Sequence, residues 1–287
     1  MHPFSGVFLL DKPVGISSFR ALDSLKRALD TTKVGHAGTL DPFATGLLIA
    51  LSGKLTKAAY LCAGMDKGYE AVIRFGAETD TLDVEGRVVG RGPLPDYDAI
   101  KKAAGNYTGA ITQTPPAFSA IGINGSRSYK LAREGLKVEV PERRVRIHSF
   151  KILDWSPPNL RVYIGCSSGT YIRSLSRDIG IACGSRAFCF SLRRVSIGPF
   201  SVRDAIGPDQ IVKTDGYDPI EFARIARIPA ILLSSGLTRE LRMGVSPDRL
   251  KLWFPRIESP TLCMSSDGKA LAMLDVKEGR LACRILF

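Results

Sequence analysis

The order of apolar and polar residues predicts both strands and helices along the chain. In residues 69–75 every second position is aromatic or aliphatic, which is the period of a strand that buries one face. In residues 172–183 apolar positions recur at spacings of three and four, which predicts an amphipathic helix capped by Thr170, with Arg173 on its opposite side. Strands and helices are therefore expected to share one core.

The same patterns extend over most of the first 200 residues. Ser17 or Ser18 can cap a helix whose apolar face is Phe19, Leu22, Leu25 and Leu29. A glycine-rich stretch, residues 35–46, is predicted to be a loop. The other predicted strands span residues 6–10, 47–51, 144–155, 160–166 and 195–200, and the other predicted helices span residues 55–62, 97–104 and 128–134.

The pattern changes near Pro229. From there the chain has short strand-like segments, residues 230–233, 261–264, 270–274 and 281–287, broken by Gly, Pro and Asp. We therefore predict two domains, a main domain over residues 1–228 and a small β module over residues 229–287. Residues 206–218 are the predicted linker.

Composition places the chain among ordinary globular proteins. It has 287 residues, of which 45 % are hydrophobic and 24 % charged. Neither a membrane-spanning stretch nor a signal peptide is recognisable, so a cytoplasmic protein is expected. The six cysteines are scattered without a C-x-x-C pair, and only three histidines accompany them, so no zinc site is expected.

The net charge of +12 adds a candidate partner. Residues 141–203 hold eleven lysines and arginines against three acidic residues. Such an excess is typical of a surface that binds a polyanion, although the solvated face of any basic protein has the same composition. No basic amphipathic helix with an aromatic face is found, which favours nucleic acid over a membrane.

One motif suggests a serine hydrolase. Residues 165–169 match the G-x-S-x-G pattern of a nucleophile elbow, with Ser167 as the candidate nucleophile. The α/β-hydrolase fold needs a histidine after that serine, and the last histidine of the chain is His148. A serine hydrolase is therefore kept only as a competing hypothesis.

Two ligand-binding motifs also fail. Gly53-Lys54 is followed by Leu55, where a phosphate-binding loop has Ser or Thr, so no nucleotide cofactor is expected. Residues 80–86 resemble the start of a calcium loop, but Gly92 stands where its bidentate glutamate is required. They are interpreted as an acidic surface turn.

The loop at residues 35–46 contains an aspartate followed by a proline. Pro42 has a fixed φ and disfavours the helical region for Asp41, so the carboxylate is held in one place. A held carboxylate can take part in a reaction, and it can equally cap a turn. The aspartate and proline alone do not decide between the two.

The full string of residues 35–46 resembles the catalytic motif of the TruB family, the bacterial tRNA pseudouridine-55 synthases. Departures from the family pattern are Ala37, Phe43 and Phe19, where Thr, Leu and a polar residue are common. The other segments that resemble the family, in the same order, are residues 10–18, 67–69, 79–83, 115–120, 129–135, 169–173 and 192–194.

The resemblance implies an α+β fold, with a mixed, largely antiparallel sheet flanked by helices and a C-terminal module of the PUA type. It implies isomerisation of uridine 55 in the T arm of tRNA by a monomer that needs no metal and no cofactor. Asp41 would be the catalytic residue and Arg173 its guanidinium partner. Tyr69 would stack on the flipped base and is a candidate to move a proton. Without the resemblance, Arg173 could be a phosphate contact and Tyr69 a core aromatic.

The resemblance also implies substrate contacts. His36 would fill the space that the flipped base leaves, Tyr171 would line the pocket, and Leu192 would close it. Lys12, Arg193 and Arg194 would serve the phosphates. The main alternative, from a different class, is a non-catalytic RNA-binding or tRNA-folding protein.

Overall fold

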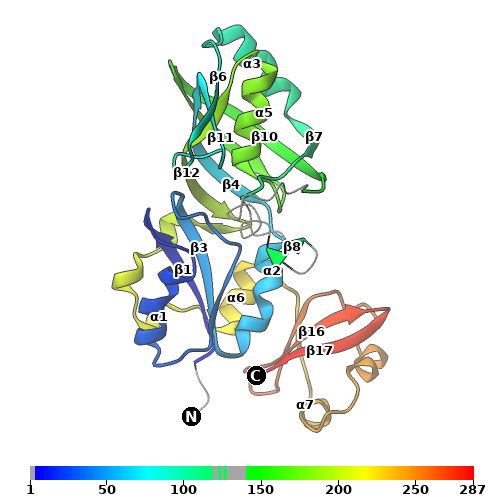
Figure 1. Cartoon of the computed structure of the whole chain (residues 1–287). Coiled ribbons are helices and arrows are strands. Elements are labelled where there is room, and N and C mark those ends of the chain that lie inside the picture. Colours follow the sequence, from blue (N-terminus) through cyan, green and yellow to red (C-terminus); the bar gives the residue numbers. More distant parts are fainter. Residues whose placement is uncertain (1–3, 119–121, 124–125, 128–139) are drawn as a thin grey trace.

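The computed structural model of the chain describes residues 4–118, 122–123, 126–127 and 140–287 (Figure 1). The helix predicted over residues 128–134 and the family-like segment 129–135 lie outside these ranges, as do residues 119–120 of the family-like segment 115–120. Within the described ranges, every helix is too short or too polar to cross a membrane.

A nine-stranded sheet runs through the main part of the molecule. Its neighbours pair antiparallel except β3 and β12, which pair parallel, so the predicted mixed and largely antiparallel sheet is confirmed. The strand order is β1-β3-β12-β4-β11-β10-β7, with β2 on β3 and β13 on β12. The strands are β1 (Val7–Lys12), β2 (Val34–Ala37), β3 (Thr45–Ser52), β4 (Lys67–Phe75), β7 (Gly109–Gln113), β10 (Arg143–Ser156), β11 (Asn159–Cys166), β12 (Ala187–Ile197) and β13 (Phe200–Ser201).

The alternation predicted for residues 69–75 is confirmed in β4. Tyr69, Ala71, Ile73 and Phe75 are all buried and belong to one core cluster. The helices α3 (Tyr97–Asn106) and α5 (Ile172–Ala182) cover this face of the sheet (Figure 1). The other helices are α1 (Asp23–Ala28), α2 (Ala59–Ala63), α6 (Pro219–Ile225) and α7 (Ser235–Arg242), with 3-10 helices η1 (Arg20–Leu22), η2 (Gly53–Ala58), η3 (Val202–Asp204), η4 (Pro208–Gln210), η5 (Lys213–Asp215) and η6 (Pro247–Leu252).

Two predictions about helix ends are wrong. Phe19, expected on the apolar face of the first helix, is 63 % exposed, because that segment begins as the short η1 and buries Leu22 and Leu25 instead. Thr170 does not cap α5: the N-cap residue is Tyr171, and the Thr170 hydroxyl donates to the Ser167 carbonyl oxygen.

Two predicted strand boundaries are also corrected. The stretch 35–46 is not all loop, because β2 ends at Ala37 and β3 begins at Thr45. Strand β12 begins at Ala187 rather than at residue 195, and it lies between β3 and β4 at the centre of the sheet.

Two small hairpins stand outside the main sheet. The first joins β5 (Ala77–Thr79) to β6 (Val88–Arg91), and its connecting loop reaches β12, where the amide of Cys189 donates to the Leu82 carbonyl oxygen. The second joins β8 (Gly122–Ile123) to β9 (Ser126–Arg127).

The C-terminal part forms a four-stranded sheet of its own, in the order β14-β15-β16-β17. All four predicted strands are confirmed, as β14 (Ala230–Leu232), β15 (Thr261–Met264), β16 (Ala270–Lys277) and β17 (Arg280–Leu286). One face of this sheet shares a core with the main part, since Leu262, Met273 and Ile285 belong to the same cluster as Leu51 and Phe222.

The predicted linker is not a linker. Residues 206–218 run back along β1, where Ile206 and Tyr217 exchange backbone hydrogen bonds with Leu9, Asp11 and Val7. The chain passes to the C-terminal sheet only after α6.

Candidate active site

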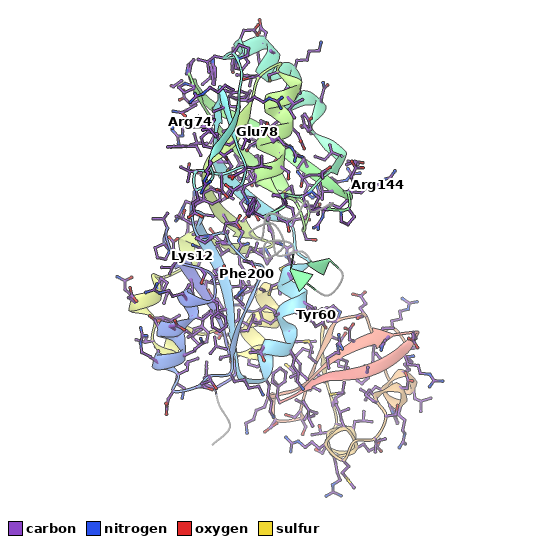
Figure 2. The ribbon with its side chains drawn as sticks, viewed as in Figure 1. Lys12, Tyr60, Arg74, Glu78, Arg144 and Phe200 are labelled. Atoms are coloured by element: carbon purple, nitrogen blue, oxygen red, sulfur yellow. The ribbon has the colours of Figure 1, made fainter. Side chains whose placement is uncertain are left out.

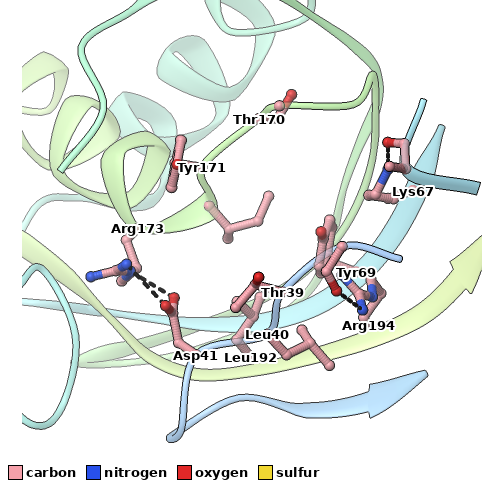
Figure 3. A pocket seen from close by; sticks show the side chains of 14 residues that line it. Thr39, Leu40, Asp41, Lys67, Tyr69, Thr170, Tyr171, Arg173, Leu192 and Arg194 are labelled. Atoms are coloured by element: carbon pink, nitrogen blue, oxygen red, sulfur yellow. Dashed lines mark hydrogen bonds and ion pairs between the residues drawn. The ribbon is translucent and has the colours of Figure 1, made fainter. Parts of the chain in front are cut away.

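A cleft of about 270 Å³ opens between the loop after β2, the strands β4 and β12, and the start of α5 (Figure 3). It contains six of the residues that the sequence singled out: Asp41, Tyr69, Tyr171, Arg173, Leu192 and Arg194. The complete lining is Gly38, Thr39, Leu40, Asp41, Ala63, Lys67, Tyr69, Gly169, Thr170, Tyr171, Ile172, Arg173, Leu192 and Arg194.

The loop that carries Asp41 is fastened on both sides. The buried hydroxyl of Ser18 accepts from the amide of Leu40 at 2.7 Å and donates to its carbonyl oxygen at 2.9 Å. On the other side, the Pro42 carbonyl oxygen accepts from the amide of Gly15 at 2.8 Å and from Lys12 Nζ at 3.3 Å. The carboxylate of Asp41 is thus held by its neighbours as well as by the proline.

Asp41 and Arg173 form an ion pair inside the cleft. Arg173 Nη2 donates to Asp41 Oδ1 at 3.2 Å, and Arg173 Nε lies 3.0 Å from Asp41 Oδ2. The Arg173 side chain is 4 % exposed, whereas that of Asp41 keeps 36 % of its area open to the cleft. The arginine is therefore not on the opposite, outer side of α5 as predicted. It points inward from the first turn, where it can neutralise the carboxylate.

Three further groups hold the Arg173 guanidinium. Nη1 donates to the Thr81 carbonyl oxygen at 2.9 Å and to Asp83 Oδ2 at 3.2 Å, and Nη2 donates to the Phe118 carbonyl oxygen at 3.0 Å. Asp83 is itself buried, at 4 % exposure. The prediction of an acidic surface turn at residues 80–86 is therefore wrong for Asp83. The match of residues 79–83 to the family was the signal that could have placed it in the site.

Burial raises the pKa of the Asp41 carboxyl above its ordinary value. Arg173 opposes this effect, Asp83 adds to it, and Lys12 opposes it more weakly. The carboxylate is surrounded by protein on most sides, so it depends on Arg173 to remain ionised.

Tyr69 lies across the cleft from this ion pair (Figure 3). Its hydroxyl is hydrogen-bonded by the Arg194 guanidinium, and burial raises the pKa of the phenol, so it stays protonated at neutral pH. Arg194 also donates to the carbonyl oxygens of Leu47 at 2.7 Å and Gly38 at 3.0 Å. A flat aromatic ring and a carboxylate thus face one space.

Tyr171 and Leu192 complete the predicted pocket residues in the cleft. Leu192 is 8 % exposed and contributes an apolar wall. Tyr171 lines the cleft from the turn before α5, and the Arg143 guanidinium lies 5.2 Å from the centre of its ring.

Lys67, which no motif singled out as a site residue, also lines the cleft. Burial lowers the pKa of its ammonium group to about 8, and Nζ donates to the Ala63 and Met65 carbonyl oxygens.

Two of the residues expected to serve the phosphates, Lys12 and Arg194, are buried in the structure. Lys12 is 0 % exposed, and its Nζ donates to three backbone carbonyl oxygens, those of Pro13, Ile16 and Pro42. Arg194 is 1 % exposed. Both side chains support the cleft loop from inside, and Arg194 also lines the cleft.

Besides Lys12, two predicted residues lie outside the cleft lining, Arg193 and His36. Arg193 points to the other face of β12, where its guanidinium forms a bidentate pair with Asp11 at 3.0 and 2.7 Å. His36 lies in β2, and burial together with Arg194 lowers the pKa of its imidazole, so it is neutral at physiological pH. Its Nδ1 is buried and has no hydrogen-bond partner in the described part of the chain.

Among the described residues, no histidine is a hydrogen-bond partner of the candidate nucleophile Ser167. Its hydroxyl accepts from the amide of Arg146 at 2.9 Å, and its carbonyl oxygen accepts from Thr170. His148 is instead paired with Asp66, at 3.1 Å. Over the described ranges, no three His, Cys, Asp or Glu side chains are grouped so that they could hold a metal ion.

Known proteins resemble the chain in sequence over the part that builds this cleft. Residues 26–172 match the family described as TruB family pseudouridylate synthase (N terminal domain). The tRNA pseudouridine synthase B of Bordetella avium (strain 197N) is 44 % identical over 215 residues, which cover 73 % of this chain and 88 % of that protein. That of Borreliella burgdorferi (strain ZS7) is 42 % identical over 250 residues, covering 84 % of this chain and 89 % of that protein.

The fold has relatives among solved structures. The archaeal box H/ACA sRNP Nop10-Cbf5 complex contains a chain that superimposes with a TM-score of 0.69 at 19 % identity, covering 99 % of this chain and 86 % of that one. A chain of an H/ACA RNP bound to a substrate RNA containing 2'-deoxyuridine superimposes with a TM-score of 0.67 at 20 % identity, covering 98 % and 83 %. At these identities the likeness concerns the fold.

Proposed function

Because the chain belongs to the TruB family of pseudouridylate synthases, we propose that it isomerises one uridine in the T arm of tRNA, position 55, with Asp41 as the catalytic residue. The chain is thus a pseudouridine synthase, an isomerase. The observation that carries the proposal is the Asp41–Arg173 ion pair, which faces Tyr69 across a cleft of nucleotide size.

The reaction breaks the bond between N1 of uracil and C1′ of the sugar, turns the base, and joins C5 to C1′. C5 then loses its proton and N1, freed from the sugar, gains one, so the product is an isomer of the substrate and no oxidant, reductant or water is consumed. Asp41 acts as a carboxylate and must be ionised when the nucleotide arrives. Arg173 keeps it so in a site where burial alone would favour the neutral acid.

The target base has to leave the stack of its RNA loop to reach Asp41, at a cost of a few kcal/mol. Tyr69 offers the flat surface on which the flipped base stacks, and Leu192 closes the apolar side. The neutral Tyr69 hydroxyl, held by Arg194, is a candidate to move the proton from C5. His36 lies outside the cleft lining. Its proposed role is to fill the space that the flipped base leaves in the RNA loop, so that the loop stays stacked.

The exposed basic residues of β10 and β11 support RNA as the substrate. Arg144, Arg146, Lys151 and Arg161 are all exposed. They are better placed than the buried Lys12 and Arg194 to meet phosphates, and Arg193 can contribute only where its pair with Asp11 opens. The T arm of tRNA is the part of the substrate that we propose enters the cleft.

The test is incubation of unmodified tRNA transcript with the wild-type protein and with Asp41→Asn, followed by position-resolved mapping of pseudouridine. We expect product at position 55 with the wild type and none with Asp41→Asn. Asp98→Asn, an exposed carboxylate of α3, is the matched control and is expected to keep full activity. Product from Asp41→Asn at the wild-type rate, or product only outside the T arm, would overturn the proposal.

The same experiment separates the competing hypotheses. A non-catalytic tRNA-folding protein would keep its whole function in Asp41→Asn. A serine hydrolase would be labelled at Ser167 by a fluorophosphonate, and we expect no label. A cytoplasmic monomer is the form we propose for the enzyme, and light scattering at working concentration measures the mass of the particle.

A further inference from the structure

Gln113, at the end of β7, has its amide fully engaged by one residue of the cleft. Gln113 Oε1 accepts from the backbone amide of Tyr171 at 2.8 Å, and Gln113 Nε2 donates to the Tyr171 carbonyl oxygen at 3.1 Å. The glutamine is 1 % exposed. A primary amide is costly to bury unless both of its halves are paired, and here both are paired with Tyr171.

The backbone of Tyr171 has few local hydrogen-bond partners, because it lies between a turn and the first residue of α5. It is the N-cap residue of α5, no side chain caps that helix, and it follows a turn in which Gly169 has a φ of +81°. The amide of an N-cap residue has no partner within its helix. Gln113 supplies that partner, so it determines how the backbone of Tyr171 is oriented between the turn and the helix.

The ring of Tyr171 is held by the neighbour of Gln113 in the sheet. Arg143 of β10 lies directly opposite Gln113 of β7 in the antiparallel register. Side chains of directly opposed residues project from the same face of a sheet. The Arg143 guanidinium lies 5.2 Å from the centre of the Tyr171 ring and donates to the Gly169 carbonyl oxygen at 3.3 Å. One cross-strand pair therefore holds Tyr171 in place: Gln113 binds its backbone, and Arg143 lies against its ring.

We propose that Gln113 is a positioning residue for the isomerisation, which acts by fixing the Tyr171 side chain against the nucleotide in the cleft. The inference rests on the proposed function, since it takes the cleft to be where the flipped uridine binds. Gln113 does not touch the nucleotide. It restricts the ring of Tyr171 to one position, so that the base is held for reaction at Asp41.

The test is a double-mutant cycle between Gln113→Met and Tyr171→Ala, measured as pseudouridine formation in tRNA transcript. Gln113→Met removes both hydrogen bonds at nearly constant volume, and we expect kcat to fall on the order of tenfold while KM changes little, because the reaction geometry and not the phosphate contacts is disturbed. In the Tyr171→Ala background the same substitution is expected to have almost no further effect.

Ser174→Ala is the matched control. Its hydroxyl donates to the Thr114 carbonyl oxygen, one residue beyond Gln113, and not to Tyr171. Its effect is expected to be equal in both backgrounds. If Gln113→Met lowered kcat equally with and without the Tyr171 ring, Gln113 would support only the start of α5, and the inference would be wrong. Gln113→Glu, which keeps the acceptor for the Tyr171 amide, replaces Gln113→Met if that variant does not fold, and is expected to retain part of the activity.

A second readout does not depend on activity. In protein labelled with 3-fluorotyrosine, the Tyr171 resonance, assigned through Tyr171→Phe, should shift or broaden in Gln113→Met but not in Ser174→Ala. An unchanged resonance would overturn the inference even where the enzyme is active. If the wild-type protein makes no pseudouridine and the resonance still changes in Gln113→Met, the proposed function is rejected. The contact between Gln113 and Tyr171 is then established all the same.

Discussion

The charge state of Asp41 depends on two opposed effects of its surroundings. Burial favours the neutral acid, and the Arg173 guanidinium, with Nε 3.0 Å from Asp41 Oδ2, favours the carboxylate. Asp83 holds the other side of the guanidinium while it raises the pKa of Asp41 slightly. Arg173 therefore serves two carboxylates, and the one open to the cleft is the one that can react.

This balance predicts a pH dependence. Activity requires the ionised carboxylate, so it is lost as the pH falls through the pKa of Asp41. Since Arg173 lowers that pKa, Arg173→Met is expected to move the acid limb of the kcat/KM profile to higher pH and to reduce activity at neutral pH. Arg173→Lys, which keeps the charge without the bidentate geometry, should shift the limb less. Profiles of the three proteins with identical acid limbs would contradict this account.

A second residue, Lys12, was expected from the family resemblance to serve a phosphate, and its side chain is buried. Sequence gives the type of a side chain but not its depth, and a lysine at the end of a strand can point inward when backbone carbonyl oxygens are available. Those of Pro13, Ile16 and Pro42 take its protons, and burial lowers its pKa to about 8. Asp83 was misread for the same reason.

Lys12→Met is therefore expected to act on the cleft loop and not on RNA affinity. Loss of the ammonium group removes the donor from three part-buried hydrogen bonds, which costs about 1–3 kcal/mol of unfolding free energy and lowers kcat. The slope of log Kd for tRNA against log salt should stay that of the wild type. Arg144→Ala, an exposed residue, should reduce that slope by roughly one while leaving stability unchanged. A reduced slope in Lys12→Met would restore the phosphate role.

At the scale of elements, the sequence predicted those with simple periodicity. The alternation in β4, the paired strands β10 and β11, and the spacing in α5 were all recognisable, since each buries one side against one core. The start of β12 was missed. Its residues 187–192 are mostly buried between two neighbouring strands, and Arg193 and Arg194 follow in adjacent positions, pointing to opposite faces of the sheet. Such a central strand has no regular alternation.

The parallel contact of β3 with β12 requires a glycine. Gly46 has a φ of +101°, and an added Cβ would lie 2.3 Å from the Arg194 carbonyl oxygen. Gly46→Ala is therefore expected to cost at least ~2 kcal/mol of unfolding free energy, because it adds backbone strain to a clash with main chain. Gly105→Ala, in α3 with open space around the new methyl group, should instead stabilise by about 0.4–1 kcal/mol. Denaturant unfolding of the two variants measures both effects.

At the scale of the whole molecule, the C-terminal sheet is packed against the main part more closely than the predicted two-domain division implies. Its residues Leu262, Met273 and Ile285 complete a core that also contains residues of β1, β3 and α6. Tyr60 of α2, labelled in Figure 2, donates to Asp275 Oδ2 at 3.0 Å, and its ring lies 5.3 Å from the Arg284 guanidinium, so a polar contact joins α2 to the C-terminal sheet. Helix α2 ends at Ala63, which lines the cleft.

A shared core predicts shared stability. The intact chain is expected to unfold in one cooperative calorimetric transition, because separation of the module would expose the apolar faces of both parts to water at about 25 cal/mol per Å². Met273 is 0 % exposed within that core, so Met273→Ala should lower the unfolding free energy of the whole protein by about 2–5 kcal/mol. The protein should still unfold in one transition, without separate melting of the module.

Leu271→Ala tests the other possibility. Leu271 is 1 % exposed and lies in the module's own core, separate from the core that the module shares with the main part. Truncation of its side chain therefore destabilises the module and leaves the interface unchanged. If the two parts are one cooperative unit, both variants lower the same transition. Two separated transitions, of which only the one belonging to residues 229–287 responds, would instead establish independent domains. Activity then follows stability in the first case, because the interface supports α2, on which one wall of the cleft is built.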